Sequence, residues 1–276
     1  MYNTIRKKVN IMKKLLSLVL CVLLMASCKN APAENNNGKK GEPEVEGITF
    51  EDRNITVKLD FTEGTGFEWL VVNKTDNLII TDDSYHVDRD EPASTGESGI
   101  YTMNCSIIDD DNADLILKLE RKGDMTAQYI SLRFYSDGTK ITGVDRKNYI
   151  VNNDFEVLYE RFSVGGLLMQ MLKGWEYETY DKNGTCGFLL RVEGEKGEIE
   201  YLYTDLKEFK DKNSFEGKIM VSDNEYTVGY DEDHNILYMH DGENVLVRLS
   251  NAKWANDRLP EIIIMTDLMD MEPYNE

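Results

Sequence analysis

Apolar and polar residues alternate with a period of two along residues 48–141. The clearest alternating runs are residues 55–61, 115–119 and 130–134. Segments rich in Gly, Asp and Asn separate the runs, at residues 63–66, 73–77, 88–99, 109–114 and 121–124. A period of two sends successive side chains to opposite faces of a β-strand. Short strands at this spacing, with no helical period between them, predict an antiparallel, immunoglobulin-like β-sandwich over residues 47–142.

The second half of the chain mixes strand-like runs with helical patterns. The strand-like runs are residues 187–193, 198–203, 218–222, 226–230, 236–240 and 245–250. Leucines and methionines at helical spacing predict a short helix over residues 164–173, and residues 204–209 have the pattern of a short capped helix. Residues 262–269 fit either a final helix or a strand. We therefore expect a mainly β chain in which the polar segment 143–154 links the sandwich to an α+β domain with an antiparallel sheet, together spanning residues 143–276.

The N-terminus has the features of a targeting segment. Two lysines precede an apolar run over residues 15–25, as in the basic and hydrophobic regions of a secretory signal. The run is shorter than the roughly 18–20 residues that a membrane-spanning helix needs. Two small residues stand directly before Cys28 and resemble the bacterial lipobox. This resemblance implies removal of residues 1–27 and attachment of lipid to Cys28; an ordinary signal peptide with an incidental cysteine is the alternative.

The segment after the signal is polar and without periodicity. Residues 28–46 are therefore expected to be the lipidated cysteine and a flexible tether. No acidic run follows Cys28 directly, and such runs resemble surface-export signals in some bacteria. We expect a lipid-anchored protein of the bacterial cell envelope, on the periplasmic face of the outer membrane.

The chain is strongly acidic, with 51 Asp and Glu against 31 Lys and Arg and a formal net charge of −20 at pH 7. Phosphate binding needs a basic surface, so this balance argues against a nucleic-acid partner. The sequence contains no catalytic-serine, phosphate-loop or dinucleotide-binding motif, and its three histidines stand in no metal-ligand pattern. Asp231, Asp233 and Asn235 have calcium-loop spacing, but Ile236 takes the place of the required Gly, which favours a charged turn. We expect no cofactor, no metal and no enzymatic activity.

Two cysteines lie outside the signal and the lipidation site. Cys105 and Cys186 each alternate with apolar residues, which places both on the apolar face of a strand. Two buried free thiols, one in each domain, are the preferred interpretation. A disulfide between the domains is the alternative. A catalytic thiol fits less well, because an apolar environment raises a thiol pKa.

Three segments of the expected sandwich carry a family resemblance. Residues 62–69 read Thr-Glu-Gly-Thr-Gly-Phe-Glu-Trp, residues 94–101 form a Gly-rich segment before a strand, and a strand of alternating leucines ends at Arg121. In order and spacing these segments resemble the three loops of the chagasin family of cysteine-peptidase inhibitors, over residues 48–141. The resemblance implies loops that project from one end of the sandwich. The first would enter the active-site cleft of a papain-like peptidase, and the other two would contact its walls.

The resemblance implies peptidase-binding roles for eight residues. They are Gly64, Thr65, Gly66, Phe67, Trp69, Gly96, Gly99 and Arg121. Gly66 would let the main chain approach the catalytic centre, with Thr65 nearest the enzyme thiol. Phe67 and Trp69 would close the sandwich beneath the loop. The glycines of the second loop would let it run alongside the enzyme, and Arg121 would anchor the third loop by charge or by stacking on an aromatic ring.

The sequence departs from the family pattern in two loops. Thr62 and Glu63 stand where the family has Asn-Pro, and Lys122 stands where it has Pro, with no Trp after it. Two functions are therefore open. The first is a lipid-anchored, monomeric inhibitor that binds a papain-like cysteine peptidase one to one and the membrane through its lipid. The alternative is a non-inhibitory envelope lipoprotein that uses the sandwich as a protein-interaction module.

Overall fold

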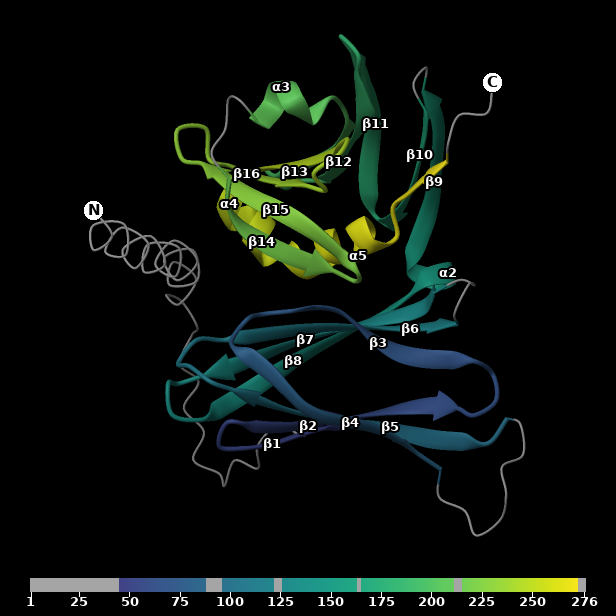
Figure 1. The fold of residues 1–276 in the computed structure, drawn as a ribbon, viewed down its shortest axis with the longest axis vertical. Coiled ribbons are helices and arrows are strands. Elements are labelled where there is room, and N and C mark those ends of the chain that lie inside the picture. Colours follow the sequence, from purple (N-terminus) through teal and green to yellow (C-terminus); the bar gives the residue numbers. More distant parts are fainter. Residues whose placement is uncertain (1–44, 88–95, 122–125, 163–164, 211–214, 273–276) are drawn as a thin grey trace, which may run out of the picture. The chain divides into compact units, whose positions relative to one another are not determined.

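The chain forms two compact units, each built mainly from antiparallel strands (Figure 1). The computed structural model describes residues 45–87, 96–121, 126–162, 165–210 and 215–272. Among these, one unit comprises residues 45–156 and 220–223, and the other comprises residues 157–219 and 224–272. No helix in the described ranges is long and apolar enough to span a membrane.

The first unit, the sandwich unit, consists of two four-stranded antiparallel sheets. The first sheet has the order β1 (Ile48–Glu51), β2 (Asn54–Thr62), β5 (Ser98–Ile107), β4 (Leu78–His86). The second sheet has the order β3 (Phe67–Lys74), β6 (Ala113–Arg121), β7 (Thr126–Ser136), β8 (Ile141–Ile150). Apart from β8, this is the strand order of an immunoglobulin constant-type domain, with A-B-E-D in one sheet and C-F-G in the other. The predicted sandwich is confirmed.

One hydrophobic cluster draws its side chains from both sheets. Alternate positions of the strands fill it, such as Ile55, Val57 and Leu59 of β2 and Ile130, Leu132 and Phe134 of β7. Val57, Leu132 and Phe134 are completely buried. The period of two that is visible in the sequence is thus the period that fills the core, and this core supports the turns at both ends of the sandwich.

The predicted linker over residues 143–154 is wrong, because most of this segment forms strand β8. It pairs with β7 along its length, and the short helix α2 (Val151–Asp154) follows it. Only three of its ten residues are buried. Because β8 is the edge of its sheet, most of its side chains are polar, and its composition therefore resembles that of a linker. The sandwich unit continues to Glu156.

The second unit contains a seven-stranded and a three-stranded sheet. The large sheet has the order β11 (Trp175–Lys182), β12 (Thr185–Val192), β13 (Glu198–Tyr203), β17 (Val245–Ser250), β16 (Ile236–His240), β15 (Asn224–Asp231), β14 (Phe215–Val221). The small sheet has the order β18 (Asp270–Glu272), β10 (Gly165–Leu172), β9 (Phe155–Phe162). The helices are α3 (Leu206–Lys210), α4 (Ala252–Asp257) and α5 (Leu259–Asp267). All six strands predicted between residues 187 and 250 are present. The short helix predicted over residues 204–209 is present as α3, between β13 and β14.

The predicted helix over residues 164–173 is wrong, because this segment forms strand β10. Leu167, Met169 and Met171 are buried, and the residues between them are half-buried. Leu167, Met169 and Met171 share one face, and the other face carries Leu168 and Leu172. Apolar residues on both faces of a strand also satisfy helical spacing.

For residues 262–269, where helix and strand were both open, the structure has helix α5. Pro260 lies in its first turn, where a missing main-chain N–H breaks no helical hydrogen bond. Its residues Ile262 to Met265 are all buried, and the buried Tyr201 hydroxyl lies 3.2 Å from the Thr266 hydroxyl. A helix that is apolar on all sides lacks the one-sided pattern by which helices are recognised in sequences.

Candidate functional site

The first two of the three loops are joined by main-chain hydrogen bonds. The Glu63 amide donates to the Glu97 carbonyl oxygen over 2.8 Å, and the Gly96 amide donates to the Glu63 carbonyl oxygen over 2.8 Å. Glu63 follows β2, and Glu97 precedes β5, the neighbour of β2 in the first sheet. Side-chain identity does not enter these two bonds, which hold the two loops side by side through their main chains.

The third segment reaches the same place through Arg121, the last residue of β6. Arg121 pairs with Phe67 in the ladder between β6 and β3, and its guanidinium carbon lies 5.5 Å from the centre of the Phe67 ring. A Cβ added to Gly66 would lie 3.5 Å from both Cγ and Cδ of Arg121. The three segments singled out in the sequence therefore meet at one end of the sandwich. We call residues 63–67, 96–97 and Arg121 the loop end.

The first loop owes its shape to two glycines. Gly64 and Gly66 have φ of +73° and +77°, in the left-handed region that other residues rarely adopt, and both are exposed. Between them, the Thr65 hydroxyl donates to the Thr62 carbonyl oxygen over 2.6 Å and accepts from the Phe67 amide over 3.4 Å. The Thr65 side chain is thus turned towards its own loop, and the exposed part of the loop is the main chain around the two glycines.

The second loop contributes Gly96, which is exposed and has φ of +96°; among the described residues no atom lies within 4 Å of an added Cβ. Gly99 differs, because it lies inside strand β5 opposite Phe61 and is buried. A Cβ there would come within 2.5 Å of Phe61 and 2.8 Å of Val87. Contrary to expectation, Gly99 does not lie on the exposed loop, and its missing side chain makes room for the Phe61 ring.

The two aromatic residues of the first segment lie inward, as their expected scaffold role requires. Trp69 is only 4% exposed, belongs to the hydrophobic core, and donates from its indole nitrogen to the Asp60 carbonyl oxygen over 3.0 Å. Phe67 is half-buried beside the Arg121 side chain. The stacking expected of Arg121 is therefore already present within this chain.

One residue of this end has no signal in the sequence analysis. Tyr85, near the end of β4, brings its hydroxyl to the main chain of Trp69 and its ring to Phe61 and Tyr101. Burial raises the pKa of the Tyr85 phenol above its ordinary value, although the hydrogen bond from Trp69 opposes the shift. Tyr85 follows the polar residues 81–84 of a strand that does not alternate, so no pattern in the sequence pointed to it or to its partner 16 residues earlier.

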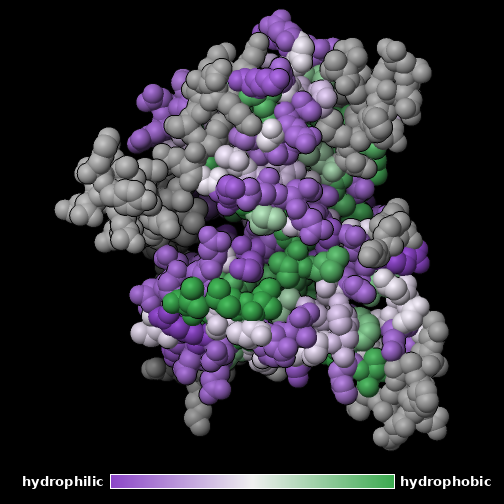
Figure 2. All heavy atoms as spheres, in the orientation of Figure 1, coloured by the Kyte–Doolittle hydropathy of each residue, from purple (hydrophilic) through white to green (hydrophobic). Residues whose placement is uncertain are grey.

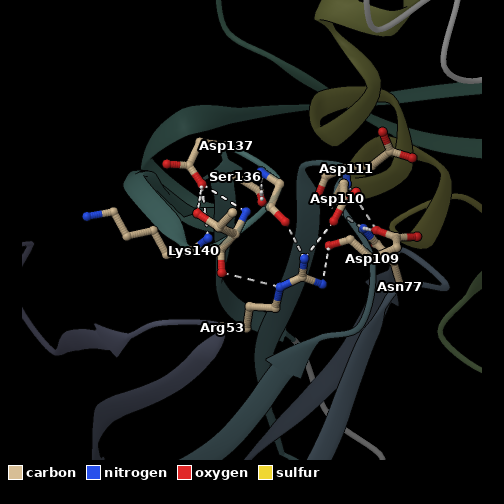
Figure 3. Close-up of polar contacts among 10 residues, drawn as sticks. Arg53, Asn77, Asp109, Asp110, Asp111, Ser136, Asp137 and Lys140 are labelled. Carbon is tan, nitrogen blue, oxygen red and sulfur yellow. Dashed lines mark hydrogen bonds and ion pairs between the residues drawn. The ribbon is translucent and has the colours of Figure 1, made fainter.

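The opposite end of the sandwich is held by side chains (Figure 3). Arg53, in the turn between β1 and β2, donates to Asp110 over 2.6 Å, to the Asp109 carbonyl oxygen over 3.0 Å, to the Thr139 carbonyl oxygen over 3.4 Å, and to the Gly138 carbonyl oxygen. Asn77 donates to the Asp109 carboxylate over 2.8 Å. The acidic stretch 109–111 is therefore a loop tip tied to neighbouring turns. We call the turns at residues 52–53, 75–77, 108–112 and 137–140 the Arg53 end.

Asp137 organises the last turn of the Arg53 end. One of its carboxylate oxygens accepts from the Thr139 hydroxyl over 2.7 Å, the Thr139 amide over 2.9 Å and the Lys140 amide over 3.0 Å. These hydrogen bonds favour the charged carboxylate and lower the pKa of Asp137 to about 2. The carboxylate is thus occupied by its own turn.

The other candidate chemistries of the sequence resolve into structural roles. Cys105 and Cys186 are both buried and free, as preferred, and burial raises the pKa of the Cys105 thiol to about 11. The Asp231 carboxylate accepts from the amide and the ring of His234, in the charged turn between β15 and β16. No group of three or more His, Cys, Asp or Glu side chains within the described ranges is placed to hold a metal ion.

One predicted site residue, Cys28, lies among residues that the structure does not describe, and so does Lys122, where the sequence departs from the family pattern. The described sandwich unit also exposes apolar side chains on two of its edge strands, with Leu70 of β3 at 40% and Ile79 of β4 at 39%. In Figure 2 a hydrophobic band crosses this unit.

Comparison with protein-family models, with curated proteins and with solved structures found no match to this chain.

Proposed function

We propose that this protein is a lipid-anchored inhibitor of papain-like cysteine peptidases, and that the loop end of its sandwich blocks the active-site cleft. The observation that carries the proposal is that three exposed glycines with positive φ, Gly64, Gly66 and Gly96, lie at the end where three connections of the sandwich meet. Two main-chain hydrogen bonds join the first and second loops, and Gly66 lies against Arg121 of the third. The strand order brings these connections together in any such sandwich, so it is the bare main chain of the glycines that favours close contact with an enzyme.

The first loop is suited to a narrow cleft. Gly64 and Gly66 expose main chain without side chains on either side of Thr65, so the backbone can approach an enzyme surface closely. Both neighbours of this loop are held by the rest of the unit, through Glu63 on one side and Trp69 on the other. A loop that is ordered before binding loses less conformational entropy on binding, which favours tight association. The mechanism needs no cofactor, no metal and no catalytic residue.

The lipid on Cys28 would hold the inhibitor at the bacterial envelope, with residues 29–46 as a tether of the sandwich unit. On the periplasmic face of the outer membrane it would act as a monomer against one peptidase molecule at a time. Its acidity makes a nucleic-acid partner unsuitable.

The test is a titration of residues 29–276 against papain and against a cathepsin-L-type enzyme, with hydrolysis of a peptide substrate as the signal. We expect inhibition that reaches completion near one inhibitor per enzyme. Absence of inhibition at micromolar protein, with the sandwich unit shown to be folded by circular dichroism, would refute the proposal.

A specific observation favours the alternative, a non-inhibitory envelope lipoprotein that binds another protein partner through the sandwich. The edge strands β3 and β4 carry the exposed apolar residues Leu70 and Ile79, which are not part of the three loop segments. The first loop also carries Glu63 in place of a Pro, which adds charge and removes a fixed φ. Under this alternative, charged substitutions at Leu70 and Ile79 abolish partner binding, whereas substitutions at Gly66 do not.

A further inference from the structure

Tyr85 connects the two sheets of the sandwich at their open edges. It lies in β4, the edge of the first sheet, and its hydroxyl reaches β3, the edge of the second. There it accepts from the Trp69 amide over 2.7 Å and donates to the Trp69 carbonyl oxygen over 3.3 Å. One hydroxyl thus satisfies both main-chain groups of one residue at the outer edge of β3, where no described strand pairs with β3 and a further strand would otherwise bind.

The ring of Tyr85 is held in place by two other aromatic residues. Phe61 of β2 packs edge-on against it, with ring centres 4.9 Å apart, and Tyr101 of β5 packs at 4.7 Å. The Tyr101 hydroxyl in turn donates to the Asp83 carboxylate over 3.2 Å. Gly99 leaves space for Phe61, as described above. The three rings come from three strands of one sheet, so the position of the Tyr85 hydroxyl is determined by that sheet.

Trp69 links the Tyr85 hydroxyl to the first loop. Its main chain is bonded to Tyr85, and its indole is bonded to the carbonyl oxygen of Asp60 in β2. The loop runs between Asp60 and Trp69, so the residues that bracket it are both fixed to the first sheet. The second loop belongs to that sheet as well, because it connects β4 to β5.

We propose that Tyr85 is a positioning residue of the loop end, whose hydroxyl sets the place of the first loop relative to the second by holding the main chain of Trp69. This inference rests on the proposed function where it concerns peptidase binding. It extends that function by assigning a role to a residue that makes no part of the three loops.

The test compares Tyr85→Phe with Tyr135→Phe in the same protein. The Tyr135 hydroxyl donates to the Asp145 carboxylate over 2.6 Å, from β7 to β8, so this control variant removes a hydrogen-bonded hydroxyl from another part of the sandwich. Amide hydrogen exchange of Trp69 and of residues 64–67 is measured by NMR, together with the inhibition constant for papain. We expect Tyr85→Phe, but not Tyr135→Phe, to speed exchange at Trp69 about fivefold and to weaken inhibition by a similar factor, the usual effect of one lost hydrogen bond.

Each outcome decides one of the two ideas. Unchanged exchange at Trp69 in Tyr85→Phe overturns the positioning role, as does faster exchange with inhibition identical to that of the unsubstituted protein. Equal effects of both variants would also overturn it, since they would reflect general loss of stability. If the unsubstituted protein does not inhibit papain, the proposed function fails; exchange at residues 64–67 then tests the positioning role alone, and no difference between the variants there overturns it.

Discussion

The two ends of the sandwich are stabilised in different ways. At the Arg53 end, a guanidinium and a carboxylate bond to the main chain of neighbouring turns, in addition to main-chain bonds such as that from the Ile141 amide to the Asp52 carbonyl oxygen. At the loop end, main-chain groups bond to one another between Glu63, Gly96 and Glu97. Both ends contain a glycine with positive φ, Gly138 at the first and Gly66 at the second.

The difference shows how one fold can provide both support and a binding edge. Side-chain bonds that converge on Arg53 connect turns that are 56 and more residues apart in sequence. At the loop end, support comes from beneath, through Trp69 and Tyr85, and the outermost positions carry little side chain. We infer that the Arg53 end is built for stability and that the loop end is built for contact with a partner.

The largest expected effect is on papain inhibition, and it is tested by substituting one glycine at each end of the sandwich. Gly66→Leu and Gly138→Leu introduce a side chain at nearly the same φ, +77° and +87°, and in both the nearest atom would lie 3.5 Å from the new Cβ. Each should lower the free energy of unfolding by ~1–2 kcal/mol, the cost of left-handed backbone. Only Gly66→Leu should weaken papain inhibition, by at least about 30-fold, as loss of an interface hot spot does.

Inhibition constants and urea unfolding curves measure both effects. Equal inhibition by the two variants would show that the two ends do not differ in partner binding. It would contradict the proposal that the first loop binds the peptidase.

The second prediction concerns stability at the Arg53 end. Arg53→Ala removes the donor to Asp110 and to three carbonyl oxygens, and should lower the free energy of unfolding by ~2 kcal/mol. Inhibition per folded molecule should stay unchanged. Urea unfolding followed by tryptophan fluorescence provides the first quantity, and titration of papain provides the second. If Arg53→Ala is as stable as the parent, the hydrogen bonds of Arg53 add nothing to the free energy of unfolding, because water replaces them equally well.

The third prediction is the counterpart at the loop end. Arg121→Ala removes a side chain that lies beside Phe67 and Gly66, and should weaken inhibition about tenfold through loss of an arginine at the interface. Its stability cost should be smaller than that of Arg53→Ala, ~0.5–1 kcal/mol, because the contact with Phe67 is a cation–π pair at an exposed site. If Arg121→Ala proves the less stable of the two arginine variants, the proposed division of roles between the ends is wrong.

The smallest expected effect is the pH dependence of the unfolding free energy that comes from Asp137, in the turn between β7 and β8. Since the pKa of Asp137 is lowered to about 2, the charged carboxylate stabilises the folded state above the ordinary Asp pKa of about 3.9. This contribution is lost as the pH falls from about 4 towards about 2. Asp137→Asn keeps an oxygen acceptor but no charge, so its difference in unfolding free energy from the parent should be constant above pH 5 and shrink below pH 4. A difference that does not change between pH 7 and pH 2.5 would contradict this assignment.

Much of the sandwich could be predicted because its strands have one apolar face. Residues 55–61 and 130–134 alternate clearly, and they form β2 and β7. Strand β10 was mistaken for a helix and β8 for a linker, because one is apolar on both faces and the other is mostly polar. Within the candidate site, the three segments were found by their glycines and their order, whereas the burial of Gly99 and the role of Tyr85 were not.

The sequence by itself determined where this chain alternates, where it turns, and which three glycine-bearing or arginine-bearing segments follow strands of the sandwich, because these are local properties of neighbouring residues. Only the tertiary structure decided that Glu63 meets Glu97, that Arg53 meets Asp110, and that Tyr85 holds Trp69. The partners of each pair are many residues apart in the sequence. A pattern of neighbouring residues does not show which strand ends lie next to one another. The pairing of strands into sheets makes that choice, since each register fixes every contact at both of its ends.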